Sequence, residues 1–92
     1  MIEEVYRIAE EMIQRVNERG VRTIDDAIAI KRIQSITPFG WKTDHFSLIL
    51  SEDPLVCLYT TGKLYVYWFG EDAVVDIDSK IASEIHSQLE GW

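Results

Sequence analysis

The chain has 92 residues, of which 47% are apolar, and a formal net charge of −7 at pH 7. This length fits one domain with a core large enough to fold without disulfides, and the single cysteine, Cys57, has no partner for one within the chain. Charged residues interrupt every apolar run before the roughly 18 residues that a membrane span needs. We therefore expect residues 1–92 to form one small globular domain that is soluble and has no membrane partner.

The compartment follows from cysteine usage and from the first residues. The start Met1-Ile2-Glu3-Glu4 lacks the basic residues and apolar stretch of a secretory signal, and a lone cysteine is typical of a reducing environment. The sequence therefore favours a cytoplasmic location.

The negative charge belongs to the second half of the chain. Residues 1–45 hold seven Lys and Arg against eight Asp and Glu, whereas residues 46–92 hold two against eight. An acidic half repels the phosphate backbone of DNA or RNA and attracts a basic partner, in a way that weakens as salt rises. The charge distribution therefore predicts no nucleic-acid partner.

The first half of the chain predicts two helices. Apolar residues recur at three- and four-residue spacing from Ile2 to Arg19, and Gly20 follows where a helix terminus falls. Thr23 and Asp26 have the form of an N-terminal capping pair, which predicts a second helix from Ile24 through Ile33. The segment Thr37-Pro38-Phe39-Gly40 is expected to stop this helix and to begin a loop into the sheet.

From Phe46 to Ile77, short segments rich in β-branched and aromatic residues alternate with turn signals, which predicts an antiparallel meander of three or four strands. Thr61-Gly62 forms either a two-residue loop, which pairs Tyr59 with Leu64, or part of a three-residue loop with another register. Both registers are open at this point. The expected strands are His45–Ser51, Leu55–Thr60, Leu64–Phe69 and Ala73–Ile77.

A last helix begins after Asp78 or Ser79, either of which suits a helix N-cap, and its apolar stripe is narrow. The predicted fold class is therefore α+β, with two N-terminal helices, a meander of three to four strands and a C-terminal helix, in the order ααββββα. The second and third strands carry apolar residues at odd and even positions alike, so both sheet faces need a cover.

Two arrangements would supply that cover. In the first, the aromatic face around Tyr65, Tyr67 and Phe69 is left uncovered by one chain and is buried in a homodimer. In the second, a three-layer monomer has helices on both faces of the sheet. Tyr65, Tyr67 and Phe69 are accordingly the candidate interface residues.

Residues that could carry chemistry are few. Cys57, His45 and His86 are the only candidates for a nucleophile and an imidazole base, and Cys57 lies in an apolar strand, where we expect it to be buried and slow to react. Asp72, Asp76 and Asp78 lack the spacing of a calcium loop, and the glycines are too scattered to form a phosphate loop. The sequence therefore predicts no catalytic residue, no metal and no cofactor.

These observations favour a small acidic, non-enzymatic protein-binding or assembly module that binds a protein partner. In the homodimer hypothesis this partner is a second copy of the chain. The alternative is a small enzyme or ligand-binding domain with a pocket near Trp41, His45 and Trp68.

Overall fold

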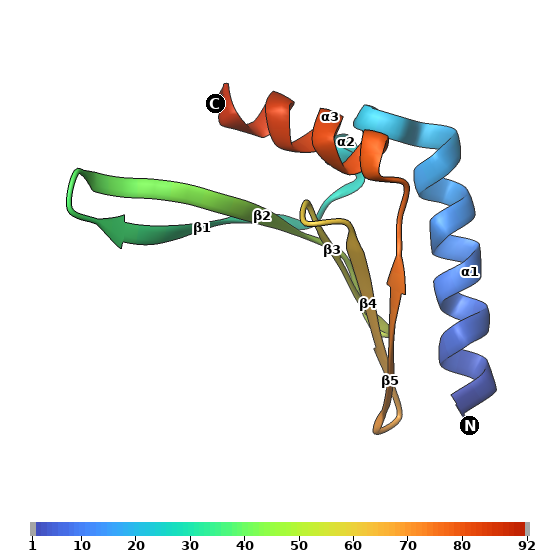
Figure 1. Ribbon diagram of the computed structural model, residues 1–92. Helices are drawn as coiled ribbons and strands as arrows, with labels where there is room; N and C mark the ends of the chain where they lie inside the picture. Colours follow the sequence, from blue (N-terminus) through green and yellow to red (C-terminus); the bar gives the residue numbers. More distant parts are fainter. Residues whose placement is uncertain (1, 92) are drawn as a thin grey trace.

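The computed structural model describes residues 2–91 and contains one five-stranded sheet with helices packed on it (Figure 1). All neighbouring strands are antiparallel, and the strand order follows the chain, β1-β2-β3-β4-β5. This confirms the α+β fold class, with five strands in place of three or four. No helix within residues 2–91 is both long and apolar enough to cross a membrane. The elements are α1 (Ile2–Arg19), the 3-10 turn η1 (Gly20–Arg22), α2 (Thr23–Asp26), β1 (Ala29–Thr37), β2 (Gly40–Glu52), β3 (Leu55–Tyr59), β4 (Lys63–Trp68), β5 (Glu71–Asp76) and α3 (Ser79–Glu90).

The second predicted helix was wrong beyond its first turn. Helix α2 ends at Asp26, and its N-terminus has no side-chain cap, so the expected role of Thr23 was also wrong. Strand β1 takes the place of the rest of that helix, with Ala29 opposite Ile49 and Ile30 opposite Leu48 on β2. The β-branched isoleucines of this segment fit a pleated strand, and pairing with β2 decided between two structures that the pattern of apolar residues allowed.

Strand β2 begins at Gly40, five residues earlier than predicted, because the expected helix stop is in fact a hairpin turn. The Thr37 side chain holds this turn: its hydroxyl donates to the Gly40 carbonyl over 2.8 Å and accepts from the Phe39 amide over 3.2 Å. Gly40 has φ +117°, a region in which a side chain is strained. The proline and glycine therefore join two strands.

The hairpin between β3 and β4 has the longer of the two loops that the sequence left open. Tyr59 pairs with Lys63 and Cys57 pairs with Tyr65, so three residues, ending in Gly62, connect the strands. Gly62 has φ +106°, and its amide donates to the Tyr59 carbonyl over 2.9 Å. This register places Leu58 opposite Leu64, on one face of the sheet.

One face of the sheet carries the helices and the core. Helix α1 contacts β4 and β5, and α3 contacts η1 and β2, on the side where Leu58 and Leu64 are buried. On the opposite side, Tyr67 is 45% exposed and Val74 is 57% exposed. The molecule thus has two layers and one open sheet face, in place of the three-layer monomer. The buried core residues are Val5, Ala9, Val16, Phe46, Leu48, Val56, Leu58, Leu64, Val66, Ala73, Ile77, Ala82, Ile85 and Leu89.

Helix α3 is fixed at its start by the predicted cap and along its length by a histidine. The Asp78 carboxylate accepts from the Lys80 amide over 2.8 Å, as an N-cap should. His86 Nε2 donates to the Glu90 carboxylate over 2.8 Å, because a carboxylate only accepts. In the neutral ring, His86 Nδ1 then accepts from the Thr60 hydroxyl, 3.1 Å away. The hydroxyl links α3 to the β3–β4 loop.

Candidate protein-binding surface

Strands β1 and β2 run beyond the rest of the sheet as a two-stranded arm, which we define as residues 31–45 (Figure 1). Pairing between β2 and β3 begins only at Ser47, opposite Tyr59, so no third strand continues along the arm. Residues 31–36 of β1 are all exposed. The arm therefore owes its structure to its own hydrogen-bonded ladder and turn, with no helix packed over residues 31–36.

A bulge marks the point where the arm leaves the sheet. Ile33 pairs with His45 and Gln34 pairs with Thr43, which leaves Asp44 as an extra residue on β2. The Ser35 hydroxyl donates to the Asp44 carboxylate across this bulge. A bulge bends its strand and increases the local twist. It accounts for the angle between the arm and strands β3 to β5 in Figure 1.

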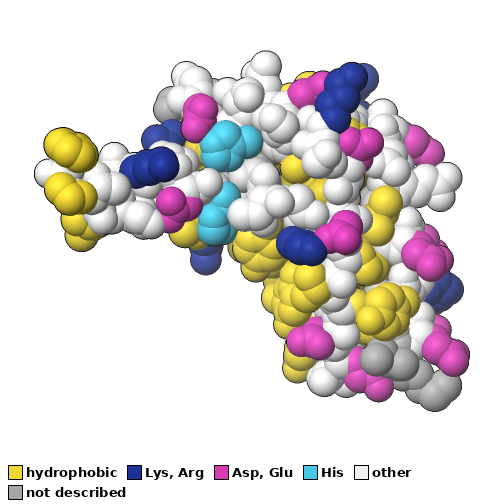
Figure 2. All heavy atoms as spheres, viewed as in Figure 1, with side chains coloured by type: hydrophobic (Ala, Val, Ile, Leu, Met, Phe, Trp, Pro, Cys, Tyr) yellow, Lys and Arg dark blue, Asp and Glu magenta, His cyan; other side chains and the backbone are white. Residues whose placement is uncertain are grey.

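The free end of the arm carries three large apolar side chains, Ile36, Phe39 and Trp41, which we call the tip cluster. Their exposed fractions are 75%, 99% and 68%. Ile36 and Trp41 pair directly across the hairpin, and Phe39 occupies the turn. Figure 2 shows apolar side chains at the end of the arm. In a single chain these side chains keep most of their surface in water, although burying apolar surface is favourable.

The arm and the rest of the chain differ in charge. The arm has three basic residues, Lys31, Arg32 and Lys42, and one acidic residue, Asp44, for a formal charge of +2. The remaining residues hold six Lys and Arg against fifteen Asp and Glu, for −9. Arg32 also lies over the ring of Phe46, with its guanidinium carbon 5.3 Å from the ring centroid. A positive arm thus extends from a strongly negative body.

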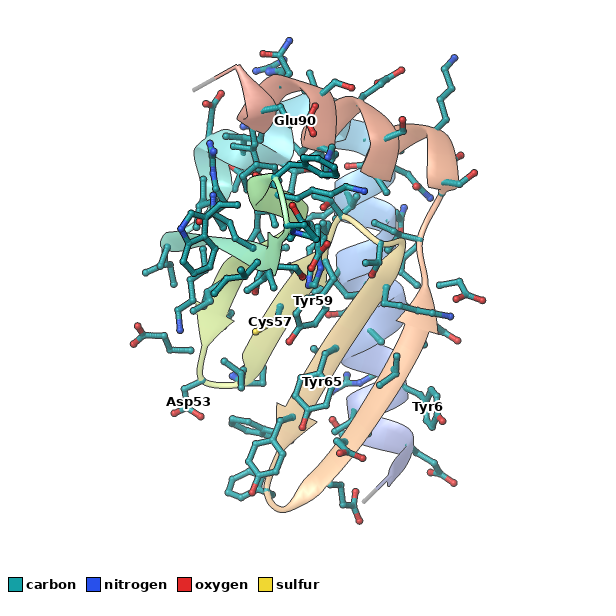
Figure 3. All side chains as sticks on the ribbon, turned by 60° about the vertical axis from the view of Figure 1, so that its left-hand side comes forward. Tyr6, Asp53, Cys57, Tyr59, Tyr65 and Glu90 are labelled. Carbon is teal, nitrogen blue, oxygen red and sulfur yellow. The ribbon has the colours of Figure 1, made fainter. Side chains whose placement is uncertain are left out.

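The open face forms the inner side of the angle between the arm and the body. The register brings Cys57, Tyr65 and Val74 into one row across three strands, on the side of the sheet away from α1 (Figure 3). Figure 2 shows apolar side chains gathered along this inner angle. The Tyr65 hydroxyl donates to Asp72 over 3.4 Å, and desolvation together with that carboxylate raises the pKa of Tyr65. The face is apolar at its centre and acidic along β5.

The three candidate interface residues do not all lie on this face. Tyr65 and Tyr67 are two residues apart on β4, and both point to the open face. Phe69 lies in the β4–β5 turn, where its φ is +49°, and its exposed ring meets Trp68 edge-on at 4.3 Å between centroids. The open face therefore ends at an exposed aromatic turn.

The residues of the alternative pocket are distributed along the sheet. Trp41 lies in the tip cluster, and His45 lies at the base of the arm, with its ring 6.1 Å from that of Tyr59. Trp68 lies beside the β4–β5 turn, near the far end of β2. At about 3.3 Å per residue, that end of β2 is roughly 35 Å along the strand from Trp41. The structure does not bring Trp41 and Trp68 together.

The remaining chemistry-bearing residues have structural partners. Cys57 is buried, as expected, and burial raises the pKa of its thiol. His86 holds α3 through its hydrogen bonds to Thr60 and Glu90. Asp78 caps α3. In the part of the chain that the structure describes, no three His, Cys, Asp or Glu side chains are grouped to hold a metal ion.

Comparison with protein-family models, with curated proteins and with solved structures found no match to this chain. The surface described above is therefore the basis for a functional conclusion. Sequence reasoning placed Phe39 and Trp41 in a loop and gave Ile36 no role. The signal that would have found the tip cluster is Pro38-Phe39-Gly40 with β-branched and aromatic residues on both sides, which is a hairpin pattern.

Proposed function

We propose that this protein is a small assembly module that binds a second copy of itself through the arm. The observation that carries the proposal is the tip cluster, three large apolar side chains held in water at the end of a two-stranded arm. Large exposed apolar side chains on a projecting element are typical of protein–protein contacts. Folding of a single chain leaves these side chains exposed, so they contribute little to its stability.

Charge favours a second copy as the partner. An arm of charge +2 is attracted to a body of charge −9, and each copy supplies both surfaces. If each of two chains places its arm on the other, the contact is made twice about a twofold axis and the assembly closes as a dimer. A basic arm also fits the edge of the open face at the exposed Asp72, whereas Asp76 on the same strand already pairs with Lys63.

The open face is the surface that would receive the arm. It presents Tyr67 and Val74 to solvent and forms an inner angle rather than a flat plane (Figure 2). Aromatic side chains at the arm tip and on this face would bury apolar area against one another, which gives the contact its strength, while the charges set its orientation. This arrangement also covers Tyr65 and Tyr67, two of the three residues for which the sequence suggested a homodimer.

Sedimentation equilibrium across a dilution series tests the proposal. We expect the mass to rise with concentration from that of one chain, 10.7 kDa, to twice that value. Trp41→Ser should raise the dissociation constant by about tenfold or more, since buried aromatic anchors dominate such contacts. Tyr6→Ser is the matched control, because Tyr6 is an exposed aromatic residue on α1, outside the arm and the open face.

Two outcomes would contradict the proposal. One is a mass of a single chain at every concentration up to the millimolar range. The other is equal weakening of the dimer by Trp41→Ser and by Tyr6→Ser, which would place the contact elsewhere.

A further inference from the structure

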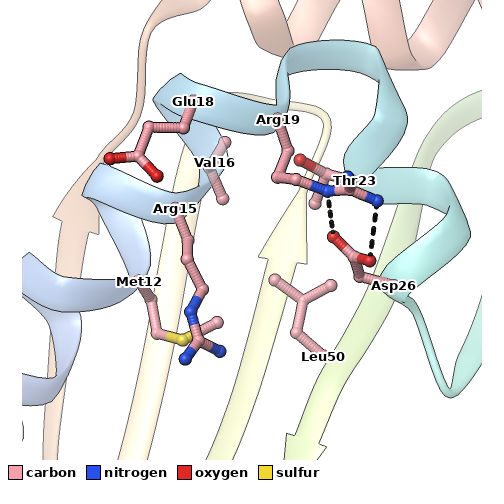
Figure 4. Close-up of a pocket in the computed structure, with 8 residues that line it drawn as sticks. All are labelled: Met12, Arg15, Val16, Glu18, Arg19, Thr23, Asp26 and Leu50. Atoms are coloured by element: carbon pink, nitrogen blue, oxygen red, sulfur yellow. Dashed lines mark hydrogen bonds and ion pairs between the residues drawn. The ribbon is translucent and has the colours of Figure 1, made fainter.

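A pocket of about 420 Å³ lies on the helix-covered side of the sheet, away from the open face, between α1, the η1–α2 turn and β2 (Figure 4). This volume is in the range of pockets that hold small molecules. Its apolar part is formed by Met12 and Val16 of α1 and by Leu50 of β2. Leu50 lies at a bulge, where β2 shifts its pairing with β3 between Ile49 and Ser51. Strand β2 therefore supplies one wall of the pocket.

Two polar groups in this pocket have no hydrogen-bond or ion-pair partner among residues 2–91: the buried Thr23 hydroxyl and the solvent-exposed Arg15 guanidinium. Thr23 is only 2% exposed, and its hydroxyl oxygen has no hydrogen-bond partner, although buried polar groups are normally paired. Arg15 has no carboxylate within ion-pair distance among residues 2–91. A buried hydroxyl without a partner costs free energy until a ligand or water satisfies it.

The second arginine of the pocket is already occupied. Arg19 donates to both carboxylate oxygens of Asp26, over 2.8 and 3.0 Å, and the two side chains neutralise each other. Figure 4 shows this pair beside Thr23, with the Arg15 guanidinium at the other end of the pocket, next to Met12. The Glu18 carboxylate also lines the pocket and points away from Arg15 in the same view. One cationic group is thus left for a ligand.

We propose that this pocket binds a small amphiphilic carboxylate that carries a second hydrogen-bonding group. The carboxylate pairs with the Arg15 guanidinium, as planar guanidinium groups do with carboxylates. A hydroxyl or carbonyl at the other end of the ligand satisfies the Thr23 hydroxyl. The aliphatic segment between them lies against Met12, Val16 and Leu50. The Glu18 carboxylate disfavours a dianion, so a single negative charge is selected.

Titration of the whole protein with ω-hydroxy carboxylates, from 4-hydroxybutyrate to 8-hydroxyoctanoate, tests this site. Binding is followed by NMR through the methyl groups of Met12, Val16 and Leu50. We expect at least one of these acids to shift the methyl signals, and to bind more tightly than the unsubstituted acid of the same length by roughly two- to tenfold, the value of one hydrogen bond.

Two variants assign the contacts. Thr23→Val, which keeps the side-chain shape, should remove the advantage of the hydroxy acid and leave the unsubstituted acid unaffected. Arg15→Met should weaken both acids by about tenfold or more, since a charge-assisted bond is lost. Arg22→Met is the control, because Arg22 is an exposed arginine of η1 outside the pocket. Thermal melts show whether each variant is folded.

Three results would overturn the site. The first is no methyl shift with any of these acids at about 10 mM, where even weak ligands occupy a site. The second is equal loss with Arg15→Met and Arg22→Met. The third is an alcohol without a carboxylate that binds as well as the acids, which would make the pocket merely apolar.

Discussion

The two halves of strand β2 differ sharply in burial. In the body, Phe46 and Leu48 are buried beneath the helices, whereas in the arm Trp41 is exposed and pairs only with Ile36. The same strand thus carries core residues at one end and an exposed aromatic residue at the other. A residue of β2 is buried where a helix packs over it and exposed where none does. Its apolar character alone does not predict its burial.

This difference separates stability from recognition. Core side chains contribute to the free energy of unfolding because they leave water on folding, about 1.5–3 kcal/mol for a large aliphatic or aromatic residue. The tip cluster stays in water, so its residues contribute little to folding and their apolar surface is available to a partner. Substitutions in the core and in the tip cluster test this separation.

Removing a core side chain should destabilise the fold far more than removing a tip side chain. Leu58→Ala should lower the free energy of unfolding by about 3 kcal/mol, through lost burial and a cavity. Ile36→Ala should change it by about 0.5 kcal/mol or less, as for exposed positions. Urea denaturation at a concentration where the chain is monomeric measures both values. Equal losses would mean that the arm is packed in the monomer.

The tip cluster should contribute to the free energy of association but not to the free energy of unfolding of the monomer. Phe39→Ala should weaken self-association by about 2 kcal/mol, the cost of truncating an aromatic anchor at a contact. Its free energy of unfolding as a monomer should equal that of the wild type, because the Phe39 ring is fully exposed. Isothermal dilution calorimetry gives the first value and urea denaturation the second. A stable dimer of Phe39→Ala would remove the tip from the contact.

Substitution of Thr60 tests whether hydrogen bonds of its hydroxyl join the sheet to α3. It accepts from the Phe46 amide over 2.9 Å and contacts His86 Nδ1, so Thr60→Val leaves a buried amide without a partner. We expect a loss of about 1.5 kcal/mol in the free energy of unfolding. Thr60→Ser keeps the hydroxyl and should lose clearly less. If both variants unfold alike, methyl packing rather than hydrogen bonding explains the role of Thr60.

The smallest effect concerns Cys57 at high pH. Burial raises the pKa of its thiol above the ordinary value of 9.0, so the folded chain holds the proton more tightly than the unfolded chain. This stabilisation is fully present below pH 9.0 and is lost as the pH rises through the higher pKa of the folded state. Cys57→Ala should therefore flatten the alkaline fall in stability. An unchanged pH profile would contradict the assignment.

The sequence predicted an element correctly where its local pattern was compatible with only one kind of secondary structure. The three-residue and four-residue spacing of α1 and the Asp78 cap of α3 identified both long helices, and the turn signal at Gly62 identified the hairpin between β3 and β4. In each case the periodicity, the cap or the turn agreed with the packing that the fold provides.

The prediction failed for β1, where local pattern and tertiary pairing disagree. The segment from Ile24 to Ile33 is apolar enough for a helix face, and only its ladder with β2, which begins at residue 40, makes residues 29–37 a strand. Because the turn at Pro38 was interpreted as a helix stop, the arm and the tip cluster could not be predicted.

Amide hydrogen exchange at high and low protein concentration tests most directly whether a second copy covers the arm. We expect amides of residues 31–45 to exchange more slowly at concentrations where the dimer forms and to recover fast exchange on dilution, while amides of α1 are unchanged. Trp41→Ser should show fast exchange in the arm at both concentrations. Equal exchange rates in the wild-type arm at both concentrations, with a dimer present by mass, would contradict it.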